Sequence, residues 1–452
     1  MGKDKKEFYS MVWKLVLPMA IQNVVNVAVI STDVIMLSKV GEKVLAGASL
    51  ASQLQFIMTL ICFGITSGAT ILTAQYWGKG DKRTVEKILG LSLKLSLIVS
   101  FFFFVLATFF PKFSMEIFSK DPAVIEEGVK YLSIVGFSYL LTAVTIVYLN
   151  ILRSVEKVFI ATLVYTVSLG TNIIVNAILI FGLLGFPKMG IVGAAIGTLV
   201  ARLVEIIMVA IYAKKNETLL RLHLQDIFKV SRILWKDYFH YATPVIFNEL
   251  CWGAGIAANA AILGHLGSSM VAASSVTQIL RQLSAVVTFG IANAAAILIG
   301  KTIGEKRYDL AQNYAKRLIR LSIISCSIGS LLIFCISPWV VKHFAVTPEI
   351  QDYLSYMLKI IVLYIIAQGI SVVFIVGIFR AGGDSRYGLS VDFSTMWLGS
   401  ILLGFIGAFI LHLPVKIVYL LLMCDEFLKV PMVIKRYKKR KWLKNVTRDF
   451  IS

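Results

Sequence analysis

The chain has 452 residues, of which 58% are hydrophobic and 15% are charged, and its mean hydropathy is +0.81. A soluble domain carries about 25% charged residues, so this composition excludes a soluble protein. The net charge of +20 could suit a nucleic-acid-binding protein, but the basic residues concentrate at the termini and in alternate loops. We therefore expect an integral protein of the lipid bilayer that binds no nucleic acid.

Apolar segments of about 20 residues are long enough to cross a bilayer as helices. Their unbroken apolar character favours helices over a β-barrel, whose strands alternate over about ten residues. The sequence predicts an all-α protein with twelve transmembrane helices, near residues 8–38, 44–77, 86–110, 126–152, 158–186, 190–213, 235–264, 270–300, 316–341, 350–379, 387–412 and 415–434.

The loops between these helices differ in charge. The even-numbered loops and the tail contain the basic segments KGKGDKR, AKKNETLLR, GEKRYDLAQNYAKR and IKRYKKRKWLK, whereas the odd-numbered loops hold few Lys and Arg residues. By the positive-inside rule, this asymmetry places both termini and the even-numbered loops in the cytoplasm. We expect a multi-pass protein of the cell membrane.

The two halves of the sequence repeat each other. When the chain is shifted by 226 residues, segment 17–41 aligns with 243–267, and Asp33 meets Asn259. The motifs GDKR and GEKR, and the endings ILR and IFR, align at nearly the same shift. Several landmarks in one order at nearly one offset indicate an internal repeat.

Six spans per half is an even number, so both halves enter the membrane in the same sense. We expect two six-helix bundles related by a pseudo-two-fold axis normal to the membrane, an arrangement typical of transporters that work by alternating access. The predicted division is an N-terminal lobe at 1–213, a cytoplasmic linker at 214–234, and a C-terminal lobe with a basic tail at 235–452.

Motifs for ATP hydrolysis or other enzyme chemistry are missing from the sequence. The stretch IGKT at 299–302 resembles the end of a P-loop, but Ala295 replaces the required glycine. The five histidines are scattered without an HExxH motif, and the five cysteines lack CxxC spacing. We expect neither an enzyme nor a cofactor, and an ion gradient remains as the energy source.

Polar residues inside the predicted spans are the candidate functional residues. Asp33 interrupts the apolar run VVNVAVISTDVIML of the first span, where an unpaired carboxylate costs about 2.5–3.5 kcal/mol. Asn172 and Asn176 are four residues apart and share one face of the fifth span. Thr198 in the sixth span lies at a similar depth. Their oxygens suit a hard cation such as Na⁺, and a proton on Asp33 would also compensate its charge.

A second acidic candidate is Glu249 in the seventh span, as a coupling or substrate-binding residue. Arg202 and Glu205 are three residues apart and are expected to pair with each other. The basic residues Arg281, Lys359 and Lys429 also fall inside predicted spans, and some are expected to extend toward the interface.

Several motifs together resemble the MATE (multidrug and toxic compound extrusion) family. They are LPM in the first span, STDVIMLSKVG followed by LAGASLA, AQYWGKGD closing the second span, LRS and FRAGGD after the fourth and tenth, and GIVGAAIGT in the sixth. The resemblance covers essentially the whole chain. It implies two lobes in a V and an antiporter in which Na⁺ or H⁺ enters while an organic, often cationic, compound leaves.

Carried over position by position, the family's amino-terminal cation site matches Asp33, Asn172, Asn176 and Thr198, and its acidic residue of span seven matches Glu249. Some members carry a further acidic residue in span ten, where this chain has Gln368 and Gly369. We therefore expect coupling at Asp33 rather than at a complete carboxyl-terminal site. A flippase for lipid-linked oligosaccharides or another amphipathic lipid is the alternative, which would need a strongly cationic cavity.

Overall fold

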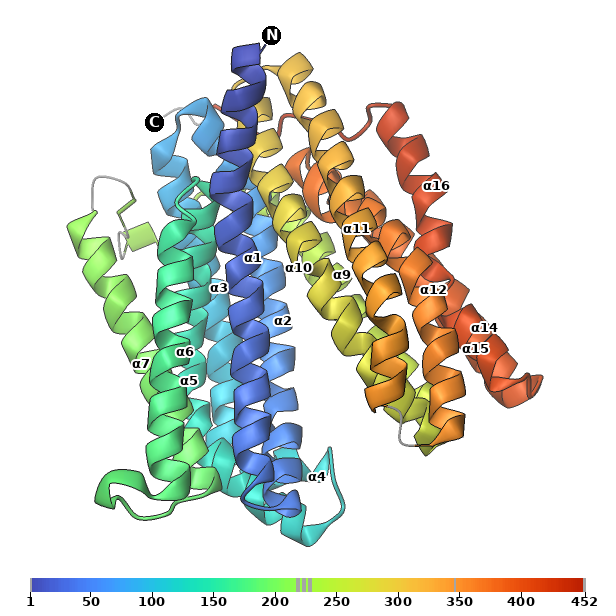
Figure 1. Cartoon of the computed structure of the whole chain (residues 1–452). Helices are drawn as coiled ribbons and strands as arrows, with labels where there is room; N and C mark the ends of the chain where they lie inside the picture. The colour runs from blue at the N-terminus through green and yellow to red at the C-terminus, as the bar shows by residue number, and fades with distance from the viewer. Residues whose placement is uncertain (1, 217–219, 222–224, 227–229, 345–346, 450–452) are drawn as a thin grey trace. The chain divides into compact units, whose positions relative to one another are not determined.

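The computed structural model describes residues 2–216, 220–221, 225–226, 230–344 and 347–449, and this part of the chain is helical without β-strands (Figure 1). The first half contains α1 (Gly2–Ser38), α2 (Glu42–Lys79), α3 (Lys82–Phe109), α4 (Pro111–Glu116), α5 (Pro122–Ser154), α6 (Phe159–Phe181), η1 (Leu183–Gly185) and α7 (Ile191–Lys215). The second half contains α9 (Arg232–His265), α10 (Ser268–Gly304), α11 (Tyr308–Phe344), α12 (Pro348–Val372), η2 (Val373–Phe379), α13 (Ser385–Asp392), η3 (Phe393–Ile401), α14 (Leu402–Phe405), η4 (Ile406–Ile410), α15 (Val415–Leu422) and α16 (Asp425–Lys438).

Eleven helices in the described part of the chain are long and apolar enough to cross a membrane. They match the first eleven predicted spans, which confirms the all-α membrane fold. The twelfth predicted span, 415–434, is not one continuous helix, because α15 ends at Leu422 and α16 begins at Asp425. The acidic pair Asp425 and Glu426 opens α16, where negative charge favours a helix N-terminus.

The helices form two compact units. Unit 1 contains Met1–Ala20, Ala74–Gly80 and Phe247–Ser452, and unit 2 contains Ile21–Thr73 and Asp81–Ile246. Helices α1, α2 and α9 therefore contribute residues to both units, whereas the division predicted from the sequence places each whole helix in one lobe. The lobe boundaries at 213 and 235 stay a prediction.

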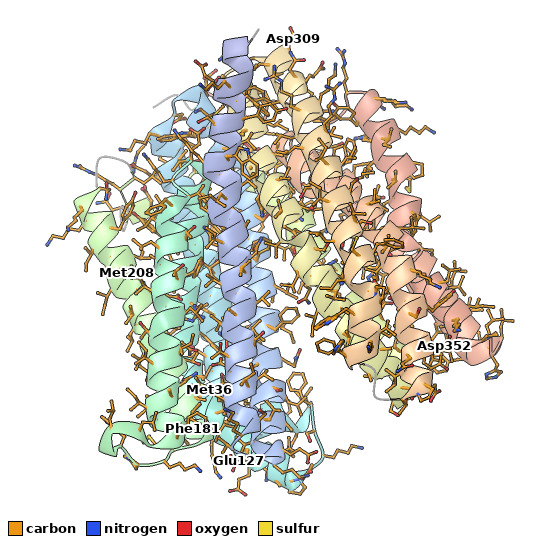
Figure 2. The ribbon with its side chains drawn as sticks, viewed as in Figure 1. Met36, Glu127, Phe181, Met208, Asp309 and Asp352 are labelled. Atoms are coloured by element: carbon orange, nitrogen blue, oxygen red, sulfur yellow. The ribbon has the colours of Figure 1, made fainter. Side chains whose placement is uncertain are left out.

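Each unit has its own hydrophobic core. In unit 2, Met58, Val135 and Tyr139 are fully buried between α2 and α5. Met36 and Phe181 lie at one end of this unit, where both pack against the same core (Figure 2). In unit 1, residues of α10, α11, α12 and α15 form the corresponding cluster. Because these helices are also apolar on the faces that the protein leaves uncovered, they are built for a lipid environment.

Only part of the predicted linker 214–234 lies among the described residues, and that part is held against α3. The backbone N–H of Arg221 donates to the Glu86 carboxylate at 2.9 Å. Arg83 donates two hydrogen bonds to buried Asp226, at 2.7 and 2.8 Å. Such two-pronged guanidinium–carboxylate pairs are directional, so this part of the linker is fixed to unit 2.

The C-terminal segment after α16 is a strap within unit 1. It has no regular secondary structure from residue 443 to 449, yet the preceding Trp442 is only 1% exposed and stacks on Tyr437. The side chain of Gln75 donates to the Lys444 carbonyl at 3.1 Å and accepts from the Val446 N–H at 2.8 Å. The strap thereby joins the end of α2 to the C-terminal helices of the same unit.

Candidate functional site

The predicted amino-terminal site residues come together in unit 2. Asp33 on α1 is half-buried, and its carboxylate accepts a hydrogen bond from Asn176 Nδ2 at 2.7 Å. The same amide nitrogen lies 3.3 Å from the side-chain oxygen of Asn172, one turn earlier on α6. Asn172, Asn176 and Thr198 are at most 8% exposed. Helix α1 and the consecutive helices α6 and α7, which are distant from α1 in sequence, thus supply one cluster of polar side chains.

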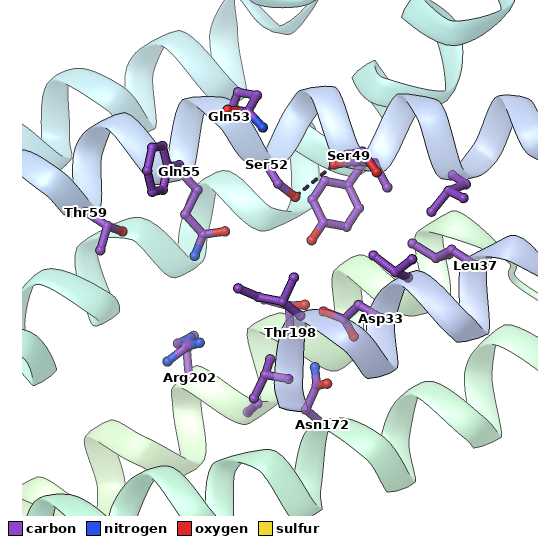
Figure 3. Close-up of a pocket in the computed structure, with 18 of the residues that line it drawn as sticks. Asp33, Leu37, Ser49, Ser52, Gln53, Gln55, Thr59, Asn172, Thr198 and Arg202 are labelled. Carbon is purple, nitrogen blue, oxygen red and sulfur yellow. Dashed lines mark hydrogen bonds between the residues drawn. The ribbon is translucent and has the colours of Figure 1, made fainter. Parts of the chain in front are cut away.

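A cavity of about 500 Å³ opens beside Asp33 (Figure 3). Asp33, Asn172 and Thr198 line it together with polar side chains of α2, among them Ser52 and Gln55. Its apolar lining includes residues of α1 and α2. Small-molecule pockets in proteins usually measure roughly 300–1,000 Å³ and combine an apolar lining with a few polar groups. The cavity therefore has the size and lining of a small-molecule site.

The basic residue of this cavity already has a partner. Arg202 lines the cavity from α7, and its guanidinium forms an ion pair with Glu205, which is 1% exposed, three residues further along the helix. This confirms the pair predicted from their spacing. Among the described residues, no ion pair joins Asp33 to a basic side chain, and its one side-chain hydrogen bond comes from Asn176, while Arg202 attracts it only from a distance.

A glycine on α7 makes the close approach of α6 possible. A Cβ atom at Gly197 would lie 1.9 Å from Asn176 Oδ1, a distance at which one of the two must move. The same Oδ1 is buried and has no hydrogen-bond partner among the described residues. Asn176 therefore presents an unused oxygen beside Asp33, and Gly197 leaves the space for it.

We expect Gly197→Ala to displace Asn176 and to weaken ligand binding at Asp33. The added methyl group also overpacks the α6–α7 contact, which typically costs about 1–3 kcal/mol. Gly170→Ala on α6 is the matched control, because a Cβ there meets nothing within 4 Å; replacing this helical glycine should be neutral or stabilising by roughly 0.5–1 kcal/mol. Thermal unfolding and gradient-driven transport of both purified variants test this, and equal behaviour of the two would contradict it.

Glu249 belongs to unit 1 and is not among the residues that line the Asp33 cavity. Its carboxylate forms an ion pair with Arg380 at 2.7 Å, and the Arg380 side chain is only 5% exposed. The sequence had presented Glu249 as an isolated acidic candidate, because no regular spacing links two residues 131 positions apart. The structure shows that this acid is already compensated by a neighbouring helix.

A group of buried acidic residues that the sequence did not lead us to expect surrounds Lys429. Lys429 is 4% exposed and does not extend to the interface; its ammonium contacts Asp392, Asp425 and Glu426 at 3.0–3.4 Å. The spacing in DEFLK, with acids three and four residues before the lysine, was an available signal. Lys359, by contrast, is exposed.

The apolar helices and the polar cavity within unit 2 are those of a multi-pass membrane transporter. The MatE family model matches residues 18–178 and 244–426, which is well over half of the chain. The chain therefore belongs to the MATE family of transporters, as its sequence motifs indicated.

Relatives and solved structures agree with this membership. The chain is 22% identical to the probable multidrug resistance protein NorM of Thermotoga maritima, over 97% of this chain and 94% of the relative. It is 20% identical to the uncharacterized transporter YisQ of Bacillus subtilis, over 91% and 90%.

Two solved structures share the fold with a TM-score of 0.85 at 20% identity. One is a MOP superfamily transporter from Pyrococcus furiosus with a binding pocket of reverse polarity, which covers 97% of this chain and 96% of its own. The other is a MATE transporter in its bent conformation, with coverages of 96% and 95%.

Proposed function

We propose that this transporter is an antiporter that exports organic, mainly cationic, compounds in exchange for Na⁺ or H⁺ at Asp33. The observation that carries the proposal is a half-buried carboxylate that receives a hydrogen bond from Asn176 and no ion pair from a described basic residue. The negative charge of the Asp33 carboxylate therefore needs a compensating ligand. That ligand can leave, because it is not part of the chain.

The groups around Asp33 suit either coupling ion. Asn176 Oδ1 has no hydrogen-bond partner within the described ranges, and the side chain of Thr198 lines the same cavity as Asp33. Carboxylate, amide and hydroxyl oxygens are ligands of hard cations. A proton would neutralise the same carboxylate without further ligands. In both cases, the positive charge of the coupling ion replaces that of the exported compound.

Export would follow from this competition. Occupation of Asp33 by the coupling ion removes the negative charge that attracts an organic cation and changes the contact of α1 with α6 and α7. The hold on the exported compound then weakens. The coupling free energy acts reciprocally, so the exported compound must weaken ion binding by the same factor.

Fluorescent-dye efflux from everted vesicles, with Na⁺ and pH gradients imposed independently, tests the proposal. Dye should move against its own concentration gradient when one of the two ion gradients is applied, and the active gradient identifies the coupling ion. Dye movement that only follows the dye gradient, unchanged by Na⁺ and by pH, would contradict antiport and would indicate a channel-like pathway.

The flippase alternative is less well supported by the cavity in unit 2. A phosphate-bearing lipid head group requires basic residues, and the guanidinium of Arg202 is already paired with Glu205. Movement of a labelled lipid between leaflets, without gradient-driven dye export, would favour the flippase over the antiporter.

For the orientation, we propose the cell membrane with both termini in the cytoplasm. The first residues of α1 and the described C-terminal segment that ends at residue 449 belong to unit 1 and lie at the same end of it (Figure 1). Lys79 and Lys444, which are among the basic residues assigned to this side, also lie in unit 1 and contact Asp449 and Asp384. A reporter protein that functions only in the cytoplasm should be active when it is fused to the C-terminus. A reporter that functions only outside the cytoplasm should be inactive there.

A further inference from the structure

The buried charges of α16 in unit 1 are not balanced. Lys429 Nζ lies 3.0 Å from Asp392 Oδ1, 3.0 Å from Glu426 Oε1 and 3.4 Å from Asp425 Oδ2. Three carboxylates therefore share one ammonium group. We call these four residues the α16 cluster. Asp425, Glu426 and Lys429 are at most 5% exposed, so water does not screen the excess negative charge.

The charged groups that surround the α16 cluster do not remove this excess. Arg380 is engaged by Glu249 at 2.7 Å. The guanidinium of Arg281 lies 5.7 Å from the ring centre of Tyr364, and both arginines attract the cluster. The neighbourhood then holds four carboxylates and three basic groups, one positive charge short of neutrality.

The other titratable groups next to the cluster are uncharged in their ordinary forms at neutral pH. The Tyr364 hydroxyl donates to Asp425 Oδ1 at 3.4 Å. The thiols of Cys251 and Cys424 lie near Asp392 and Asp425, respectively. None of these groups supplies the missing positive charge.

Two buried oxygen atoms at this place have no hydrogen-bond partner in the described part of the chain. They are Glu426 Oε2 and the Oδ1 atom of Asn248, whose amide nitrogen donates to Asp392 at 2.9 Å. Glu426 is 5% and Asn248 7% exposed. Burying a polar atom without a partner costs free energy. A proton on one carboxyl group would both lower the excess charge and provide a donor.

We propose that Asp392, Asp425 and Glu426 share one exchangeable proton, which makes the α16 cluster a second protonation site, distinct from Asp33. The ammonium of Lys429 occupies the centre of the three carboxylates, where a metal ion would have to bind. No group of three His, Cys, Asp or Glu residues in the described ranges is arranged to hold a metal. The proton belongs to the group as a whole, because strongly interacting sites titrate together.

Asp392 provides the route by which this proton exchanges. Its side chain is 18% exposed, against 6–7% for Asp425 and Glu426. Asp392 also lies at a change of helix geometry, because the π-helical segment η3 begins at the next residue, Phe393. A second π-helical segment, η2, ends at Phe379, directly before Arg380. π-Helical segments are rare and often occur at functional sites.

Infrared spectroscopy of purified Asp33→Asn protein tests the proposal, because this background removes the carboxyl group of the first site. At neutral pH we expect a carbonyl band of a protonated carboxylic acid that shifts in ²H₂O and disappears as the pH rises. Adding Asp392→Asn, Asp425→Asn or Glu426→Gln should abolish the band, since each leaves three carboxylates facing three basic groups. Asp352→Asn, at an exposed ion pair with Lys416 in the same unit, should leave it unchanged.

Three results would overturn the proposal: no such band in the Asp33→Asn protein, a band that survives all three replacements in the cluster, or a band that added Na⁺ removes, which would make the occupant a metal cation. Circular dichroism and gel filtration establish that each variant is folded. If replacements at the two deeply buried acids prevent folding, Asp392→Asn at the more exposed position still decides the question. The measurement is independent of antiport at Asp33, so either proposal can fail alone.

Discussion

The Asp33→Asn variant should lose gradient-driven export down to the level of vesicles without the transporter. In the native protein, Asn176 Nδ2 donates a hydrogen bond to Asp33 Oδ1 at 2.7 Å. The amide of the variant keeps an oxygen that can accept this hydrogen bond, so the local packing is preserved. It cannot carry a negative charge, and therefore it cannot exchange a coupling ion for an organic cation. The measurement is dye efflux from everted vesicles under the gradient that drives the native protein.

The control for this variant is Asp309→Asn, a carboxylate in the first turn of α11, far along the chain from the α1 site. It should export dye at the native rate. Folding is checked by the thermal unfolding of both purified proteins, which should match that of the native transporter within a few degrees. Native export by the folded and inserted Asp33→Asn protein would exclude Asp33 as the coupling residue.

Lys429→Met should lower the free energy of unfolding by about 3–5 kcal/mol, because removing one partner leaves buried charges uncompensated. Methionine fills a similar volume, so the loss comes from charge rather than from a cavity. Three carboxylates would remain within a site that is almost closed to solvent. The measurement is unfolding of the purified protein by titration with a denaturing detergent.

Lys416→Met is the matched control. Its ammonium pairs with Asp352 at 2.7 Å in the same unit, but the two side chains are 39% and 62% exposed. Exposed ion pairs contribute about 0–1 kcal/mol, so this variant should unfold almost like the native protein. Adding Glu426→Gln to Lys429→Met should recover part of the lost stability. Similar losses at Lys429 and Lys416 would show that the α16 cluster contributes no more than a surface pair.

Spacing along single helices was enough to predict part of the site. Asn172 and Asn176 are four residues apart, and this distance alone places them on one face of α6. The same reasoning paired Arg202 with Glu205. It failed for Glu249, whose partner Arg380 lies on another helix, and for Asp392, which reaches Lys429 from α13. The role of Asp33, Asn172, Asn176 and Thr198 in cation binding stays a prediction.

The sequence by itself determined the membrane class, the twelve apolar segments and the family. Hydrophobicity and helical period are local properties of the sequence. In the bilayer, each span must also form the hydrogen bonds of its own backbone internally. Only the tertiary structure decided which polar groups meet. The rotation and register of each helix depend on packing, such as the space that Gly197 leaves for Asn176. The surroundings of Lys429 likewise depend on contacts between helices, because Asp392 of α13 joins the two acids of α16 around its ammonium group.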